Sequence, residues 1–170
     1  ETGERSLFEA CVAERIAGYQ TQECLDIFRS ILQCVQVLHK ARVVHADLKP
    51  RNIIRVVSKS RHTARWLLCD MDASTDVGQP IGKKSSSGYE PPELARVKYS
   101  HSGTELERAD TSFDIWSLGV ILYELSAGRT MFNQDTSNDQ LVEEADEVRL
   151  CTWETISPER LAPVFVRHHD

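Results

Sequence analysis

The sequence predicts a mainly α-helical domain with one short β-hairpin, and three observations lead to this fold class. The length of 170 residues is that of one domain, large enough to bury roughly 70% of the surface of the unfolded chain. The longest apolar patterns repeat at helical spacing. Two short apolar runs of residues that favour strands flank a polar segment, which is typical of a hairpin.

The composition excludes several classes of protein. Charged residues make up 27% and hydrophobic residues 41%, and no apolar run is long enough to span a bilayer, so we expect no membrane partner. The formal net charge of -6 argues against a nucleic-acid partner. Five cysteines without CxxC spacing indicate reduced core residues and a cytoplasmic (intracellular) location. The start Glu1-Thr2-Gly3 has neither an initiating Met nor a leader, which suggests an excised piece of a longer protein.

Three helices are predicted from the apolar periodicity. Ser6 and Glu9 have the spacing of a capping box and open a first helix that should end at Gly18. A second helix over residues 21–38 has a wide apolar stripe and should lie in the core. A third helix over residues 110–125 is apolar on nearly all sides, so we expect it in the middle of the domain.

The rest of the chain is assigned to shorter elements. Residues 53–57 and 65–69 are the two strands of the predicted hairpin, and the second strand delivers Asp70 at its end. His39 is interpreted as a surface or helix-end residue. The remaining segments are a loop over 73–88, a short helix starting at 91–94, an acidic helix over 137–146 opened by a capping box of Ser137 and Gln140, and a last helix starting at 157–159.

The stretch from His45 to Asn52 carries the chemistry of this sequence. Its apolar neighbours and Pro50 predict a rigid loop that enters a strand. Asp47 can orient a hydroxyl group, Lys49 can contact a phosphate, and Asn52 can bind a hard cation. These are the parts that phosphoryl transfer needs.

Four segments in register resemble the C-terminal lobe of the eukaryotic protein kinase superfamily. Residues 45–52 resemble its catalytic loop, and Asp70-Met71-Asp72 stands where the family has Asp-Phe-Gly. Residues 89–93 resemble the close of the activation segment, and residues 114–119 the central buried helix. The match runs from about residue 6 to residue 141. It implies a protein-kinase-like C-lobe, which is part of an α+β parent fold.

The resemblance implies roles for the residues of the loop and its surroundings. Asp47 would orient the substrate hydroxyl and accept its proton, while Lys49 would steady the transferring phosphoryl group of ATP. Asn52 and Asp70 would hold Mg²⁺, completed by nucleotide phosphates. Ile54 matches the floor under adenine. The Lys49-Pro50 pair is similar to the Ser/Thr-directed form of the loop, so serine or threonine residues of a protein substrate are expected.

Four further residues would support the site structurally. Asp114 would brace the backbone of the catalytic loop that starts at His45, and the Ser86 hydroxyl would bond towards Lys49 and Asp47. Glu93 would pair with an Arg that the family carries in its last helices. These supports are implied by the resemblance.

Two substitutions depart from the family pattern. Ala46 replaces the Arg that receives a phosphate on the activation segment, so switching by that route should be absent. Activity of the intact protein should then not need phosphorylation of Thr75 or of serines 85–87. Asp72 replaces a flexible Gly and should restrict flipping of this segment.

A working kinase also needs a Gly-rich lid over the phosphates and a strand Lys paired to a helix Glu, both from the N-terminal lobe. The resemblance begins just after the family's hinge, so we expect the N-lobe to be absent from this chain. Residues 1–170 would then be a partial protein kinase domain, from after the hinge to the helices that follow the central buried helix. We expect the isolated chain to bind ATP poorly or not at all.

Two alternatives of other classes remain open. A pseudokinase or scaffold domain is favoured by Ala46 and Asp72, while the presence of Asp47, Lys49 and Asn52 together with Asp70 favours an enzyme. A small-molecule phosphotransferase shares the HxD loop and a following acidic metal ligand. The segments over 89–93 and 114–119 argue against it because they resemble a peptide-binding shelf.

Overall fold

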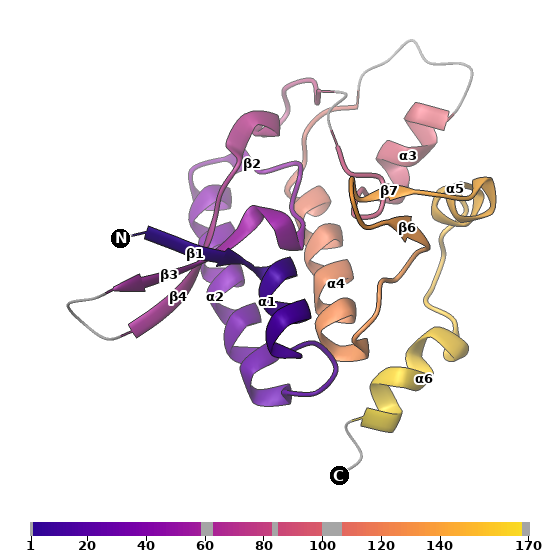
Figure 1. The fold of residues 1–170 in the computed structure, drawn as a ribbon. Helices are drawn as coiled ribbons and strands as arrows, with labels where there is room; N and C mark the ends of the chain where they lie inside the picture. The colour runs from indigo at the N-terminus through magenta and orange to yellow at the C-terminus, as the bar shows by residue number, and fades with distance from the viewer. Residues whose placement is uncertain (1, 59–62, 83–84, 100–106, 168–170) are drawn as a thin grey trace.

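Two long helices, α2 (Thr21–Lys40) and α4 (Thr111–Ala127), form the centre of the fold, and the other elements pack around them (Figure 1). The computed structural model describes residues 2–58, 63–82, 85–99 and 107–167. The other elements are β1 (Thr2–Ser6), α1 (Leu7–Glu14), β2 (Val43–Val44), η1 (Pro50–Asn52), β3 (Ile53–Ser58), β4 (Thr63–Leu68), η2 (Met71–Ala73), β5 (Thr75–Asp76), α3 (Pro92–Tyr99), β6 (Gln134–Asp135), β7 (Gln140–Leu141), α5 (Glu144–Cys151) and α6 (Pro158–Arg167). The predicted helical character and the predicted hairpin are confirmed, but the structure has more short strands than the one hairpin that was predicted.

Helix α2 buries one face against α4 and the sheet. Positions three and four residues apart lie on one side of a helix, so the buried face is formed by Cys24, Ile27, Ile31 and Val35. The expectation that the whole apolar stripe lies in the core was wrong at its flanks. Leu25 and Leu32 are 40% and 41% exposed.

Helix α4 lies in the middle of the fold, as its composition predicts, although Ile115 is exposed. Asp110 caps its N-terminus, where its carboxylate accepts a hydrogen bond of 2.8 Å from the Ser112 N–H. This bond lowers the pKa of Asp110. Gly128 ends the helix at φ 65°, a left-handed conformation that glycine adopts at little cost.

Helix α1 begins at the predicted capping box and ends earlier than predicted. The Ser6 hydroxyl accepts from the Glu9 N–H at 3.2 Å, and the Ser6 N–H donates to the Glu9 carboxylate at 2.8 Å. The predicted end at Gly18 was wrong, because Arg15 takes the left-handed cap conformation at φ 53°. Gly18 instead donates its N–H to the Leu125 carbonyl at 2.7 Å, which joins the α1–α2 turn to α4.

Strands β3 and β4 form the predicted antiparallel hairpin, with Ile53 opposite Leu68. Strand β1 pairs with the other side of β3, so the sheet has the order β1-β3-β4. The sequence did not predict β1, because its residues, Thr-Gly-Glu-Arg-Ser, do not alternate apolar and polar. The sheet packs on α2, where the Ser30 hydroxyl donates to the Trp66 carbonyl at 3.0 Å.

The segment from Gln134 to Leu141 is a small β-hairpin, β6–β7, and the predicted helix start at Ser137 was wrong. Side chains of this segment bond to nearby backbone groups instead of capping a helix. The Asp135 carboxylate accepts from the Ser137 N–H at 2.8 Å, and the Asn138 side-chain oxygen accepts from the Gln140 N–H at 3.0 Å. The acidic helix α5 therefore begins later, at Glu144.

A two-residue antiparallel ladder joins β2 to β5, with Val43 opposite Asp76 and Val44 opposite Thr75. The predicted loop over 73–88 thus contains one short strand. All five cysteines are free thiols, but only Cys24 is buried, so the prediction that they are core residues was wrong for the other four. Within the described ranges, no helix has both the length and the apolar character needed to cross a membrane.

Candidate active site

The loop from His45 to Asn52 is anchored at both ends by buried apolar residues. Val44, in β2, and Leu48 are fully buried, and Pro50 is buried at the start of η1. Ala46 has φ 65°, an uncommon conformation for a residue with a side chain. This turn is stabilised by contacts from α4.

Asp114 of α4 provides those contacts. Its carboxylate is fully buried and accepts from the His45 N–H at 2.9 Å and from the Ala46 N–H at 3.0 Å. His39 of α2 donates its Nε2–H to the same carboxylate at 2.8 Å. His39 lies in the last turn of α2, as interpreted, but it is not a free surface residue, since it joins α2 to the support of the loop.

The His45 ring links the loop to the strand that precedes Asp70. Its Nε2–H donates to the Cys69 carbonyl at 3.2 Å, and its Nδ1 accepts from the Asp47 N–H at 3.4 Å. A neutral imidazole with the proton on Nε2 satisfies both contacts. The Cys69 N–H in turn donates to the Asn52 carbonyl at 2.9 Å.

Asp47, Lys49 and Ser86 meet at the centre of the site. One Asp47 oxygen accepts from the Ser86 N–H at 3.2 Å, and the other lies 3.5 Å from Lys49 Nζ. Lys49 Nζ donates to the Ser86 hydroxyl at 2.7 Å. The Asp47 side chain is only 4% exposed. A carboxylate, an ammonium and a hydroxyl from two separate segments thus share one small volume.

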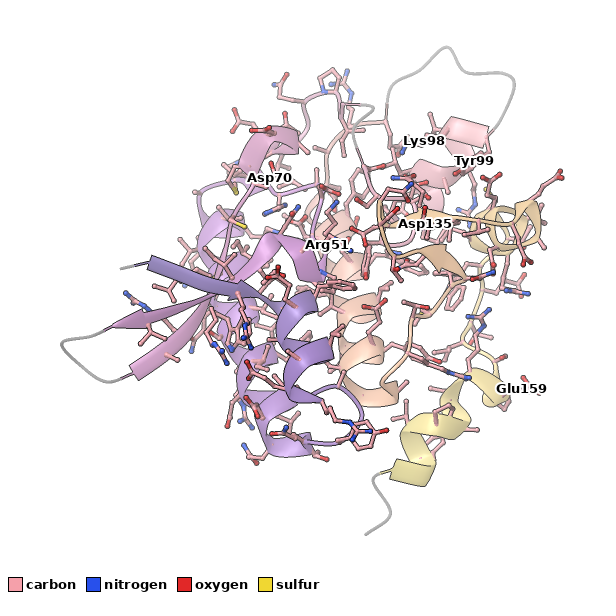
Figure 2. All side chains as sticks on the ribbon, in the orientation of Figure 1. Arg51, Asp70, Lys98, Tyr99, Asp135 and Glu159 are labelled. Carbon is pink, nitrogen blue, oxygen red and sulfur yellow. The ribbon has the colours of Figure 1, made fainter. Side chains whose placement is uncertain are left out.

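Asn52 and Asp70 are the residues that could hold a divalent cation. Asn52 Nδ2 donates to the Asp47 carbonyl at 2.8 Å and to its carboxylate at 3.2 Å, so the amide oxygen is the atom suited to a metal. Asp70 is exposed in the turn after β4, at φ 60° (Figure 2). In the part of the chain that the structure describes, no cluster of three or more His, Cys, Asp or Glu side chains could hold a metal alone. Two oxygen ligands completed by phosphates fit this donor set.

The close of the predicted activation segment is bonded to α4. Tyr89 is buried, its carbonyl accepts from the Ser117 hydroxyl at 2.8 Å, and its hydroxyl lies 3.0 Å from the Glu124 carboxylate. Burial raises the pKa of Tyr89 and raises the pKa of Glu124 to about 8. The Glu90 carboxylate pairs with Lys98 of α3 at 2.5 Å.

The other two predicted site residues lie apart from this centre. Ile54 lies in β3 opposite Leu67, and its side chain is half-buried. Glu93 lies in the first turn of α3 and forms no ion pair with another described residue.

Two further residues at the site, Asp139 and Arg51, were not predicted. Asp139, in the β6–β7 hairpin, lies 3.4 Å from Lys49 Nζ and 3.3 Å from Arg51 Nε. No sequence signal could have placed Asp139 there, because it follows Lys49 by 90 residues and belongs to a segment predicted as helix.

The comparisons with known proteins agree with this arrangement. The model of the family described as "Protein kinase domain" matches residues 1–163. This chain belongs to the protein kinase family. The finding argues against the small-molecule phosphotransferase considered above.

Individual protein kinases are similar over most of this chain. It is 30% identical over 148 residues to the serine/threonine-protein kinase PEPKR2 of Arabidopsis thaliana, covering 84% of this chain and 28% of that protein. It is 31% identical over 136 residues to the human dual specificity tyrosine-phosphorylation-regulated kinase 3, covering 79% of this chain and 21% of that protein. It is 32% identical over 115 residues to the mouse ribosomal protein S6 kinase alpha-6, covering 68% of this chain and 14% of that protein. The chain thus spans about a quarter or less of the length of these kinases.

Proposed function

We propose that the protein containing this chain transfers the γ-phosphoryl group of ATP to serine or threonine residues of protein substrates. The observation that carries the proposal is the convergence of Asp47, Lys49 and Asn52 on one loop whose backbone is held by Asp114. Phosphoryl transfer depends mainly on positioning and on neutralising charge, and these three side chains can do both.

Each residue has a distinct part in the proposed reaction. The Asp47 carboxylate orients the substrate hydroxyl and accepts its proton as the oxygen attacks phosphorus. The Lys49 ammonium neutralises charge on the transferring phosphoryl oxygens. Asn52 and Asp70 would hold Mg²⁺, which supplies further neutralisation of the phosphates. Ser86 keeps Lys49 close to Asp47 through its hydroxyl.

The deciding experiment is the Asp47→Asn substitution in the protein at its natural length. Asparagine keeps an oxygen for the Ser86 N–H but cannot take a proton, so phosphate transfer should fall by at least about 100-fold. Asp76→Asn is the matched control, because Asp76 is exposed in β5 and makes its ladder contact through the backbone. Equal activity of Asp47→Asn and the unmodified protein would disprove the role of Asp47.

The preference for serine and threonine rests on the Lys49-Pro50 pair and on relatives that are named serine/threonine kinases. A relative named as a dual-specificity kinase makes tyrosine the competing acceptor. Matched peptides that differ only in Ser, Thr or Tyr at the acceptor position test this point. Faster phosphorylation of the Tyr peptide would contradict the proposal.

We also propose that residues 1–170 form the C-terminal lobe of a larger kinase domain in a cytoplasmic protein. The small share of each relative that this chain covers supports a lobe supplied by the rest of the protein, and the free thiols fit a reducing compartment. The isolated chain should then bind ATP weakly, and calorimetry that gave a micromolar dissociation constant would contradict this proposal.

The second candidate is a binding role without phosphate transfer, as in a pseudokinase. The observation that favours it is the burial of the central groups, with the Asp47 and Lys49 side chains 4% and 15% exposed. A protein of natural length that folds and binds its partner but transfers no phosphate to any acceptor would select this candidate.

A further inference from the structure

The β6–β7 hairpin is bonded to both halves of the candidate active site. The Gly88 N–H donates to the Asp139 carbonyl at 3.1 Å, and a Cβ atom at Gly88 would lie 1.8 Å from the Gln134 side-chain oxygen. The hairpin and the segment before α3 are thus too close for a side chain between them. Further hydrogen bonds across this contact are Leu141 N–H to Ser87 Oγ at 2.7 Å, Gln140 Nε2 to the Ser85 carbonyl at 3.2 Å, and Gln134 Nε2 to Tyr89 Oη at 3.1 Å.

The turn of this hairpin directs one carboxylate at the catalytic loop. Asp139 has φ 61°, and its N–H donates to the Asp135 carbonyl at 2.8 Å. Its side chain is 3% exposed, and its Oδ2 lies 3.4 Å from Lys49 Nζ and 3.3 Å from Arg51 Nε. This buried Oδ2 has no hydrogen bond of good geometry in the structure. Oδ1 accepts a long hydrogen bond of 3.4 Å from Arg51 Nε, and the attraction of Oδ2 to the two cations is electrostatic.

Arg51 has two contacts besides those with Asp139. Its guanidinium carbon lies 3.9 Å from the centre of the Phe8 ring, and its Nη2 donates to the Thr136 carbonyl. Figure 2 shows Arg51 on the catalytic loop near the strand that carries Asp135. A second positive charge therefore lies next to Lys49 at the same carboxylate oxygen.

The surroundings of Lys49 show what Asp139 does there. An ammonium group has three protons to donate, and three protein oxygens lie within 3.5 Å of Lys49 Nζ: Ser86 Oγ, Asp47 Oδ2 and Asp139 Oδ2. The contact with Asp139 is an ion pair without a hydrogen bond, so a phosphoryl oxygen that approaches Lys49 has to compete with this carboxylate for the same positive charge. Of the two carboxylates, Asp47 also accepts hydrogen bonds from Ser86 N–H and Asn52 Nδ2. Asp139 would lose only a long hydrogen bond of 3.4 Å from Arg51 Nε to its Oδ1, so it is the easier of the two to displace.

We propose that Asp139 is a positioning residue that occupies the phosphoryl-oxygen position between Lys49 and Arg51, and that a phosphate anion displaces it. Its carboxylate holds the two cations in place before phosphate binds and competes with the phosphate for them. The description of this position as a phosphoryl site rests on the proposed function. The competition between two anions for the same two cations can be measured without any phosphate transfer.

Asp139→Asn is a clean test of this competition. Asparagine has the same shape, tolerates the left-handed backbone, and keeps the carbonyl that accepts from Gly88 N–H. Only the negative charge is removed. Asp135→Asn is the matched control, because it makes the same change on the same hairpin at an exposed side chain whose oxygen can still accept from the Ser137 N–H.

The measurement is the dissociation constant of tripolyphosphate for the protein at its natural length, by calorimetry at low salt. Asp139→Asn should bind tripolyphosphate at least tenfold more tightly than the unmodified protein, and Asp135→Asn should stay within twofold. The gain should disappear in the double variant Asp139→Asn with Lys49→Gln, which a merely structural role of Asp139 would not predict. Glycine also adopts a φ of 61° readily, so Asp139→Gly should show the same gain in affinity. This variant replaces Asp139→Asn in the test if the Asn variant does not fold.

Unchanged or weaker tripolyphosphate binding by a folded Asp139 variant would overturn the inference. A gain that persists without Lys49 would also overturn it, because the anion would then bind elsewhere. The proposed function is tested separately. A protein that transfers no phosphate but shows the Lys49-dependent gain would contradict the proposed kinase activity and still support the role of Asp139.

Discussion

Asp114→Asn should destabilise the protein strongly, because one buried carboxylate satisfies three donors. The two oxygens of Asp114 accept from His45 N–H, Ala46 N–H and His39 Nε2–H at 2.8–3.0 Å. Asparagine offers one accepting oxygen and places an NH₂ group against the remaining donors. At least one buried donor then loses its partner.

The size of the effect follows from these contacts. An unpaired buried donor costs about 1–3 kcal/mol, and each remaining bond weakens by about 1 kcal/mol when its acceptor loses its charge. The expected loss in the free energy of unfolding is about 3–5 kcal/mol. That is a large part of the roughly 5–15 kcal/mol that stabilises a typical domain.

Urea denaturation followed by tryptophan fluorescence measures this loss, since Trp66 is buried near α2 and Trp116 lies on α4 itself. Asp110→Asn is the control, because asparagine caps a helix as well as aspartate does and the change should stay within about 0.5 kcal/mol. Equal stability of the two variants would refute the support assigned to Asp114.

Three further predictions concern stability. Burial raises the pKa of Glu124 to about 8 from its ordinary 4.5, so between these pH values the folded state holds a proton that the unfolded state lacks. The free energy of unfolding should therefore fall as the pH rises through this window, by at most about 1.4 kcal/mol per pH unit. Glu124→Gln should remove this dependence in urea titrations at several pH values. Ser6→Ala should cost about 1 kcal/mol in the same denaturation assay, whereas Ser6→Thr should cost little because it keeps the cap. Gly88→Ala should lower the free energy of unfolding by about 1–3 kcal/mol, since the new Cβ forces the Gln134 side chain to move. Gly119→Ala, where a Cβ would meet nothing within 4 Å, should raise it by about 0.5–1 kcal/mol, and a loss at Gly119 equal to that at Gly88 would contradict the steric explanation.

The parts of the fold that the sequence predicts correctly are those with strong local signals. The capping box at Ser6, the apolar composition of α4 with its terminal Gly128, and the two apolar runs of β3 and β4 each depend on neighbouring residues. Strand β1 lacks such a signal and forms because β3 offers it an unpaired edge. The β6–β7 hairpin was mistaken for a helix because Ser137 has the spacing of a cap, while Asp135 and Asn138 favour turns.

The residues of the candidate site also fall into those that the sequence predicts and those that it does not. Asp47, Lys49 and Asn52 are neighbours along the chain, so their proximity could be predicted from the sequence alone. His39 and Asp139 reach the site only through the packing of α2 against α4 and through the contact of the hairpin with the loop. Sequence spacing does not encode contacts between residues 75 or 90 positions apart.

The ladder between β2 and β5 has a consequence for how the site is held together. It closes a single loop of chain that starts at Val44, ends at Thr75, and contains Asp47, Asn52 and Asp70. Closing a flexible loop of this length costs roughly 3 kcal/mol of chain entropy. The proposed base and metal ligands therefore share one entropic cost, which the ladder offsets together with the bonds from Asp114 and the β3–β4 pairing. The site should form and disappear as one cooperative unit.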